Sequence, residues 1–181
     1  MKNIILLTLG LFLNTSCAQN KPTYIDINQL SIKGINYQTS LKEIKIILGE
    51  PLKHKNIDDP EGEYGETPAI YDYFDYKGIK VMYIKYEYMD KKEIENIEIK
   101  SNRFPLKINN KQIKIGDDFL KIKEILPLEY NKFLENHLEI KKEKEYEIIG
   151  GNLKIDNLEP SNIVFTIKNG KVNGISIGFS K

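Results

Sequence analysis

The sequence has few of the residues on which disulfides, metal centres and redox sites are built. It contains 1 cysteine, 2 histidines and no tryptophan. Because Cys17 is the only thiol, an intrachain disulfide and a paired-cysteine metal or redox site are excluded. His54 and His137 are far apart, and no other His or Cys stands near either of them at ligand spacing. We therefore expect no metal site.

Motifs of nucleotide-binding proteins and enzymes are also scarce. The chain has no P-loop and no G-x-G-x-x-G fingerprint, and we expect no serine at the strand-to-helix turn that carries a hydrolase nucleophile. The acidic stretch 58–66 lacks the spacing of a calcium loop and is expected to be a solvated loop. The 26 acidic residues leave paired carboxylates open. We expect no cofactor and no catalytic residue, and a periplasmic enzyme of unknown class is the third alternative.

Excess charge of either sign is missing. Lys+Arg is 27 and Asp+Glu is 26, and loss of Lys2 with a leader would leave 26 against 26. Arg103 is the only arginine, and lysine is a poor bidentate reader of phosphate. The composition therefore excludes an electrostatic nucleic-acid binder.

The chain also lacks an apolar run long enough to span a membrane, which takes about 20 residues. Its apolar run, Ile4 to Leu13, follows Lys2 and precedes Asn14-Thr15-Ser16-Cys17. This order predicts an export signal over residues 1–18 with lipid attachment at Cys17. Cleavage after Ala18, which would release a soluble protein, is the alternative. By resemblance to enterobacterial sorting, the absence of Asp after Cys17 favours the outer membrane, facing the periplasm.

Two segments, residues 35–48 and 113–126, match when the sequence is laid over itself. In both, apolar residues recur with the spacing i, i+3, i+6, i+7, which predicts an amphipathic helix. The matched apolar positions are Leu41, Ile44, Ile47 and Leu48 in the first segment, and Phe119, Ile122, Ile125 and Leu126 in the second.

Helix boundaries follow from the flanking residues. Ser40 with Glu43 predicts a capping box for the first helix, and Asp117 or Asp118 is expected to cap the second. Gly49 followed by Pro51, and Pro127, predict where the two helices end.

After each helix the apolar period changes to 2, which predicts strands. Ile97 and Ile99 match Ile175 and Ile177 at the same offset as the helices. A short strand pair is expected before each helix, at 25–37 and at 106–115. The expected later strands are Tyr71–Tyr76, Val81–Tyr88, Ile94–Ile99, Ile163–Ile167 and Ile175–Phe179, with an Asn169-Gly170 hairpin turn.

These elements predict an α+β fold of two tandem two-layer repeats, each an amphipathic helix packed on an antiparallel sheet. The first repeat covers residues 19–104 and the second covers 105–181. The second carries an extra segment, Leu128–Pro160, in which the spacing of Leu128, Phe133, Leu134 and Leu138 indicates another helix.

The segment Thr39 to Pro51, with its cap, Glu43-Ile44 and Leu48-Gly49-Glu50-Pro51, resembles the SmpA/BamE-like lipoproteins. Their superfamily includes the β-lactamase inhibitor protein, itself a tandem repeat of helix on sheet. The mature chain is also similar to a family of exported envelope proteins of the Bacteroidetes group. Gln38 departs from the family pattern, which usually has glycine there. The resemblance implies non-catalytic protein binding in the envelope.

Aromatic residues form the one unusual surface candidate. Of the 11 tyrosines, 7 lie between Tyr64 and Tyr88. Tyrosine on an open sheet is a common interface residue, and cross-strand packing within the fold is the competing interpretation. We expect whichever sheet face the helices leave uncovered to bind a partner. The candidate partner-binding residues are Tyr71, Tyr73, Phe74 and Tyr83.

The sequence thus predicts a monomeric, lipid-anchored envelope protein that presents a sheet surface to another envelope or exported protein. The alternative is an enzyme-inhibitor or immunity-type protein that inserts the loop 56–68 into its target.

Overall fold

The computed structural model describes residues 24–60, 67–137, 139, 141, 144–154 and 161–179. The predicted export signal and the lipidation site Cys17 lie outside the described residues. Within the described part of the chain, no helix has the length and apolar character needed to cross a membrane.

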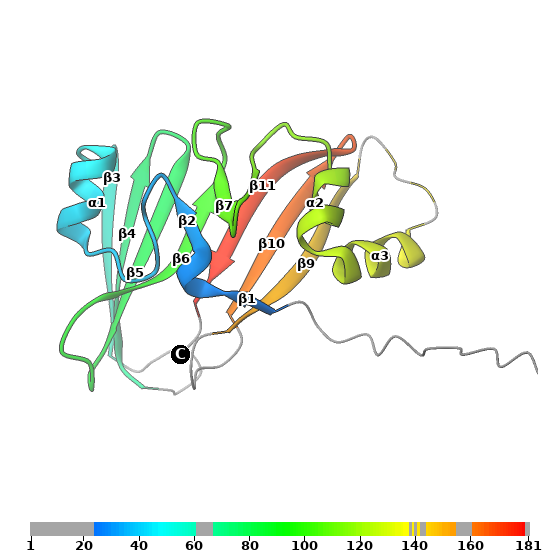
Figure 1. Cartoon of the computed structure of the whole chain (residues 1–181). Coiled ribbons are helices and arrows are strands. Elements are labelled where there is room, and N and C mark those ends of the chain that lie inside the picture. Colours follow the sequence, from blue (N-terminus) through cyan, green and yellow to red (C-terminus); the bar gives the residue numbers. More distant parts are fainter. Residues whose placement is uncertain are drawn as a thin grey trace, which may run out of the picture.

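The fold is built on one eight-stranded sheet with the strand order β1-β9-β10-β11-β6-β5-β4-β3 (Figure 1). All neighbours pair antiparallel except β1 and β9, which pair parallel. The strands are β1 Tyr24–Asp26, β3 Lys53–Asp59, β4 Ala69–Tyr76, β5 Ile79–Tyr86, β6 Glu93–Ile99, β9 Glu145–Lys154, β10 Ser161–Lys168 and β11 Lys171–Gly178.

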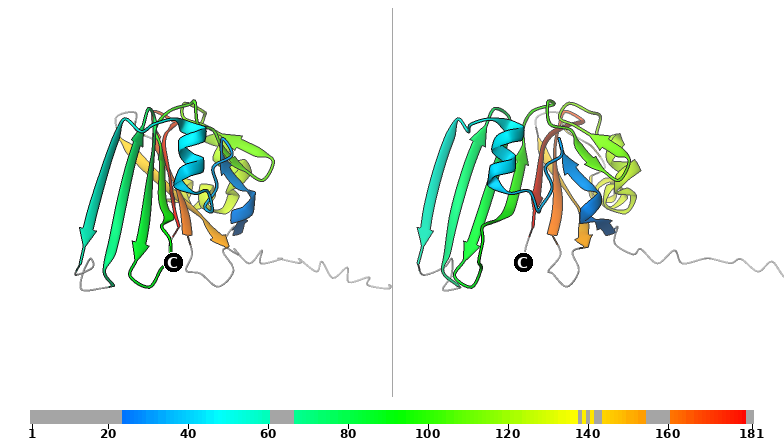
Figure 2. Two further views of the ribbon diagram at one scale, coloured as in Figure 1. Left: turned by 90° about the vertical axis from the view of Figure 1, so that its left-hand side faces the viewer. Right: turned by 60° about the vertical axis from the view of Figure 1, so that its left-hand side comes forward.

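A second layer lies against one face of this sheet, here called the covered face (Figures 1 and 2). The opposite face, the open face, carries none of the described helices. The mixed α and β composition and the mostly antiparallel pairing that the sequence predicts are confirmed. The second layer consists of α1 Leu41–Leu48, α2 Leu120–Ile125, α3 Pro127–Asn136, the 3₁₀ turn η1 Ile27–Gln29 and a small sheet of β2 Leu30–Ile32, β7 Leu106–Ile108 and β8 Lys111–Ile113.

Helix α1 begins and ends as predicted. The Ser40 hydroxyl accepts a hydrogen bond from the Glu43 amide, and the Glu43 carboxylate accepts one from the Ser40 amide. This reciprocal capping box satisfies two amides that the first turn would otherwise leave unpaired. Gly49 ends the helix with a φ of 84°, a conformation that favours glycine. Ile44 is fully buried, whereas Ile47 is 37% exposed.

The second helical segment differs in detail from its prediction. Phe119, not an aspartate, occupies the N-cap position of α2, although the Asp118 carboxylate still accepts a hydrogen bond from the Leu120 amide at 2.9 Å. Pro127 both ends α2 and opens α3, because its missing N–H is no loss at the first helical position. The helix expected in the 128–138 region is confirmed as α3.

The predicted hairpin between β10 and β11 is confirmed. Asn169 and Gly170 both have positive φ, 55° and 69°, as a two-residue type I′ turn requires. Gly78 turns β4 into β5 with a φ of 94°, and a Cβ there would lie only 2.3 Å from the Cβ of Ser101. Close approach and backbone conformation both require glycine at this turn.

Two long strands were not expected from the sequence. Residues 56–59, which the inhibitor hypothesis assigned to an inserting loop, belong to β3, and residues 145–154 form β9. The stretch Lys53-His54-Lys55-Asn56-Ile57-Asp58-Asp59 has no apolar alternation, because β3 is an exposed edge strand. Strands of this kind give no hydrophobic period from which to predict them.

The two short strand pairs expected before the helices form differently from one another. The pair β7 and β8 is a hairpin, as expected. In the first pair β1 instead joins β9 of the large sheet, and β2 pairs with β7. Only an isolated bridge, Ile32 with Ile35, remains of the predicted local pairing. The small sheet therefore links segments that are far apart in sequence.

One hydrophobic core fills the space between the layers. It rests on rows of β-branched side chains from β5, β6, β11 and β10 and continues under both helical regions. Among the least exposed of these residues are Ile97, Ile99, Ile163, Phe165 and Ile177, each fully buried.

Two buried tyrosines in this core provide a matched stability test. The Tyr83 hydroxyl donates to the Thr39 carbonyl at 2.9 Å and ties β5 to the start of α1, whereas the Tyr76 hydroxyl has no hydrogen-bond partner among the described residues. We expect Tyr83→Phe to lower the free energy of unfolding by about 1 kcal/mol and Tyr76→Phe to leave it unchanged or raise it. Urea unfolding of both variants would measure this, and equal losses would contradict it.

Candidate functional site

The open face is aromatic and amphipathic over β4 and β5. Successive strand residues point to opposite faces, so Tyr71, Tyr73 and Asp75 lie on the open face of β4. The rings of Tyr71 and Tyr73 are stacked with centroids 6.4 Å apart, and Tyr73 is 39% exposed. Opposite Tyr71 in the register, Ile84 is buried on the same face. At this end of the open face Tyr73 is therefore the exposed aromatic side chain, and it stacks on the half-buried Tyr71.

The four candidate residues divide between the two faces. Tyr71 and Tyr73 lie on the open face, as described above. Phe74 and Tyr83 lie on the covered face, where their rings meet edge to face with centroids 6.0 Å apart. They are 4% and 2% exposed and belong to the core. Only the first two are placed where a partner could contact them.

A hollow of about 480 Å³ lies on the open face over β3 to β6, next to Tyr73. Sequence reasoning did not find it, because its walls come from four strands whose register the sequence does not give. We call it the open-face hollow. It is lined by Lys53, Lys55, Tyr73, Phe74, Asp75, Lys80, Val81, Met82, Asn96 and Glu98.

Charge in the open-face hollow is arranged in a row across the strands. Lys53, Asp75, Lys80 and Glu98 are successive register partners on β3, β4, β5 and β6. Glu98 also forms an ion pair with Lys100 at 3.2 Å. Lys55 stands beside Tyr73 in the register and has no ion pair among the described residues. The hollow thus combines an aromatic side and Met82 with lysines that are able to meet acidic groups.

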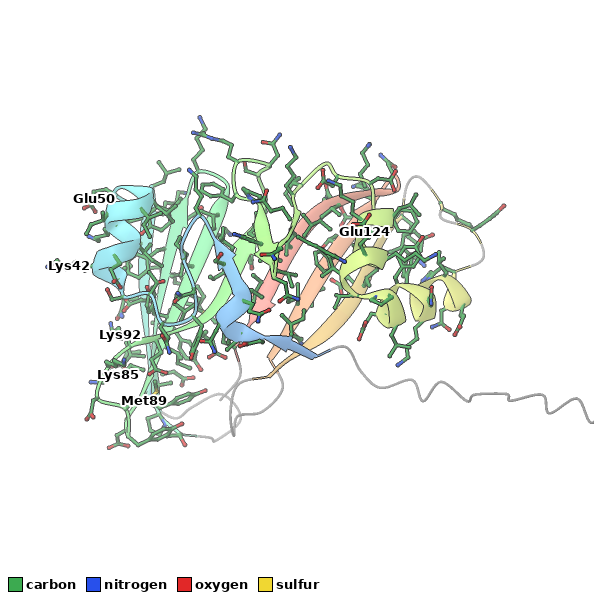
Figure 3. All side chains as sticks on the ribbon, in the orientation of Figure 1. Lys42, Glu50, Lys85, Met89, Lys92 and Glu124 are labelled. Atoms are coloured by element: carbon green, nitrogen blue, oxygen red, sulfur yellow. The ribbon has the colours of Figure 1, made fainter. Side chains whose placement is uncertain are left out.

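The covered face carries a separate polar cluster around Asp72, a charged side chain only 3% exposed. Its carboxylate is hydrogen-bonded to His54 Nε2 at 2.8 Å, accepts from Asn56 Nδ2 at 2.8 Å, and forms an ion pair with Lys92. The His54 ring stacks on Phe74 with centroids 4.4 Å apart. Figure 3 shows Lys92 below α1, at the end of the sheet that this helix does not cover.

The environment of Asp72 keeps its carboxyl ionised. Burial alone would raise the pKa, but the hydrogen bonds from Lys92, Asn56 and His54, together with the positive charge of Lys92, lower it below its ordinary value. All three partners engage the carboxylate. The cluster is therefore a satisfied polar network that fastens edge strand β3 to β4.

The two histidines lie apart in the fold, each with its own partner. His54 belongs to the Asp72 cluster, and His137 ends α3 with its Nδ1 2.8 Å from the Phe133 carbonyl oxygen. No group of three His, Cys, Asp or Glu residues able to hold a metal ion occurs in the described part of the chain.

Residues 174–178 form a G-x-S-x-G pattern, which is typical of hydrolase nucleophile elbows. Sequence reasoning did not consider this serine, because it does not stand between a predicted strand and a predicted helix. Ser176 lies within β11, not at such a turn. Its hydroxyl accepts a hydrogen bond from Asn96 Nδ2 at 3.1 Å on the neighbouring strand. Gly174 has a packing role, because a Cβ there would lie 3.2 Å from the Thr166 hydroxyl. The pattern does not form a nucleophile site here.

Among the described carboxyl groups, that of Glu95 has a strongly raised pKa. It is the extra residue of a β-bulge in β6, because Asn96 pairs with Met82 while Ile94 pairs with Tyr83. Its carbonyl accepts a hydrogen bond from the Phe179 amide at 2.8 Å. Burial raises the pKa of its side chain to about 7. The strand pairing continues on both sides of the bulge, and the carboxyl group of Glu95 lies in a poorly solvated position.

Comparison with known proteins gave no significant match to any protein-family model, curated protein or solved structure. The resemblance to the SmpA/BamE-like lipoproteins therefore stays a prediction that depends on the motif at residues 39–51.

The Asp72 cluster predicts a loss of stability on neutralisation. Asp72→Asn removes the charge that three partners engage, and we expect the free energy of unfolding at pH 7 to fall by about 1–3 kcal/mol. Because the folded-state pKa lies below the ordinary value of 3.8, the carboxylate stabilises the fold above that pH, and this contribution is lost as the pH falls through the lowered pKa. Chemical unfolding at pH 7 and pH 3 would measure both effects, with exposed Asp90→Asn as the control. Equal losses in the two variants would refute the role of the cluster.

Glu95 predicts the opposite pH dependence. Its folded-state pKa is about 7 against an ordinary value of 4.5, so stability is highest below pH 4.5 and decreases as the pH rises to about 7. We expect Glu95→Gln to stabilise the protein at pH 8 by about 1–2 kcal/mol, a range reduced for residual contact with water, and to have little effect at pH 4.5. Thermal unfolding at both pH values is the measurement, and the half-exposed Glu98→Gln is the control. No gain at pH 8 would show that the carboxyl is well solvated.

Proposed function

We propose that this chain is a non-catalytic cell-envelope protein that binds another protein through the open face of its eight-stranded sheet. The observation that carries the proposal is the open-face hollow, where Tyr73 and Met82 lie among lysines. Aromatic residues and methionine are enriched at protein interfaces, and a hollow beside a rigid sheet offers a pocket for an anchoring side chain. The twisted sheet is backed by one core and is therefore a stiff platform.

The proposal places the protein in the envelope because of its N-terminal sequence. An apolar run followed by Ser16-Cys17 is typical of a lipoprotein signal, so the mature chain would be held to a membrane by a lipid on Cys17. Such an anchor leaves the sheet free to meet a partner in the aqueous space beside the membrane.

We also propose that the fold arose from a tandem duplication, with residues 19–104 and 105–181 as its two units. The register supports this proposal. The offset of 78 residues that lays Leu41 on Phe119 also lays Ile97 on Ile175, and the two strands matched in this way pair with each other through Ile99–Ile175 and Ile97–Ile177. Strands β6 and β11 therefore meet as two related copies would across a two-fold axis.

The small sheet also joins the two proposed units, because β2 pairs with β7 through Leu30–Ile108 and Ile32–Leu106. Leu30 and Leu106 are 76 residues apart, two fewer than the 78 that separate Ile97 from Ile175, so the small sheet does not repeat at the same offset. Support for the duplication therefore comes from the pairing of β6 with β11.

Site-specific photocrosslinking in the protein's own cells tests the binding proposal. A photoreactive residue at Lys80, in the open-face hollow, is compared with one at exposed Lys107 of β7, in the second layer. We expect one defined crosslinked protein from position 80 and not from position 107. Identical products at both positions, or none at position 80, would contradict binding at this surface.

The crosslinked partner then permits a test of the aromatic contact. We expect Tyr73→Glu to weaken binding by at least about tenfold, because it replaces an aromatic residue of the lining with a charge. The matched control is Tyr88→Glu, since Tyr88 is 70% exposed but lies beyond β5 and outside the hollow. Equal binding by the two variants would argue against the proposed surface.

A further inference from the structure

The outer edge of β3 is open. This strand is the last in the sheet order and pairs with β4 on one side only, and no described strand lies along its other side. The first four of its seven residues, Lys53 to Asn56, are exposed, as is Asp58. A strand of this length with free backbone N–H and C=O groups along one side is a template for pairing with another strand. Figure 2 shows it standing at the margin of the sheet, away from the second layer.

The charges of β3 are divided between its two ends. Lys53 and Lys55 lie in its first half, and Asp58 and Asp59 in its second half. No ion pair joins any of these four side chains to another residue in the described ranges. The strand therefore has a basic end and an acidic end, and none of the four side chains forms an ion pair within the described fold, although Lys53 stands beside Asp75 in the register.

We propose that β3 pairs antiparallel with β3 of a second copy of this chain, centred on Asn56. In this arrangement Lys53 of each copy faces Asp59 of the other. His54 likewise faces Asp58, and Lys55 faces Ile57, over which its aliphatic stem packs. The two sheets become one continuous sheet across the dimer.

The register follows from the sequence of the strand. A two-fold axis perpendicular to the sheet keeps the open faces of both copies on one side, so residues of equal facing must pair. A centre at Lys55 would place the two copies' Lys55 side chains against each other. A centre at Ile57 would leave Lys53 and His54 beyond the end of the partner's strand. Only the centre at Asn56 pairs all seven residues and sets each lysine at position 53 against an aspartate.

The same charges explain selectivity. Lysine on an edge strand opposes pairing with strands in general, because it leaves an unpaired charge in the joint. A second copy running antiparallel supplies a carboxylate, that of Asp59, for Lys53 and is therefore preferred. Since the two open-face hollows each include Lys53 and Lys55, they would lie next to each other along one face of the dimer. This inference concerns self-association alone and does not depend on the proposed partner, and it differs from the monomer predicted from the sequence.

Charge exchange tests the proposal. The full chain, purified as its own cells process it, is examined by sedimentation velocity in density-matched detergent over a wide concentration range. A single pair of edge strands buries little surface, so we expect a dimer that dissociates on dilution and weakens with added salt. Lys53→Asp and Asp59→Lys should each raise the dissociation constant by about tenfold or more, since each change creates two like-charge contacts per dimer.

The double variant, Lys53→Asp with Asp59→Lys, restores opposite charges across the joint and should return the dissociation constant to within about threefold of the native value. Lys107→Asp, on the second layer, should change nothing. Lys53 also faces Asp75 within the chain, so thermal unfolding of each variant is needed to show that the fold is kept. Asp59 faces the uncharged Ala69 within the chain, so Asp59→Lys tests the dimer contact independently of an internal charge pair. A protein that stays monomeric at every concentration, or a dimer unaffected by the single changes or not rescued by the double one, would overturn the proposal.

Discussion

The pairing of β6 with β11 is the contact on which the rest of the structure depends. It joins strands from the two halves of the chain through the ladder pairs Ile97–Ile177 and Ile99–Ile175, all at most 2% exposed. Helices α1 and α2 have 8 and 6 residues, too few to bury a separate sheet each. Joining the half-sheets lets one core serve both, because the apolar rows of β5, β6, β11 and β10 become continuous. Without this joint neither the covered face nor the open face would exist as a surface.

A sheet covered on one side only must divide its residues by face, and this division produces the candidate site. The covered face takes the apolar row Tyr76, Ile79, Ile99 and Ile175, while the next row on the open face is Asp75, Lys80, Glu98 and Ser176. Hydrophobic burial is thus satisfied on one side, and the other side is free to carry charge and tyrosine. The Asp72 network is the exception, a buried charge tolerated because three polar partners engage it where α1 no longer covers the sheet.

Sequence periodicity predicted many of the elements whose burial is one-sided, but it missed the polar strand β3 and also β9, in which Tyr146 and Ile148 are buried and Glu147 between them is exposed. Helix α1, the Asn169-Gly170 turn and strands β4 to β6 carry strong local signals, and the structure has them close to the expected residues. Strand β3 has a polar sequence because both of its faces meet water, so nothing periodic marks it. The partners of β1 and β2 were also out of reach, since pairing between distant segments depends on loop paths and on the shared core, not on local pattern.

The candidate site was half predictable for a related reason. Alternation along β4 and β5 separates Tyr71 and Tyr73 from Phe74 and Tyr83 but does not say which set faces the helices. Counting the aromatic residues of each strand therefore does not distinguish the exposed pair, Tyr71 and Tyr73, from the buried pair, Phe74 and Tyr83. The strand register decides which face is covered. Phe74 shares its cross-strand row with Val81 and Ile97, which are apolar, whereas Asp75 shares its row with Lys80 and Glu98, which are charged. Three aligned charged positions cannot all be buried without partners on every side, so the face that holds them must be the one left to solvent, and Tyr73 must lie there with them.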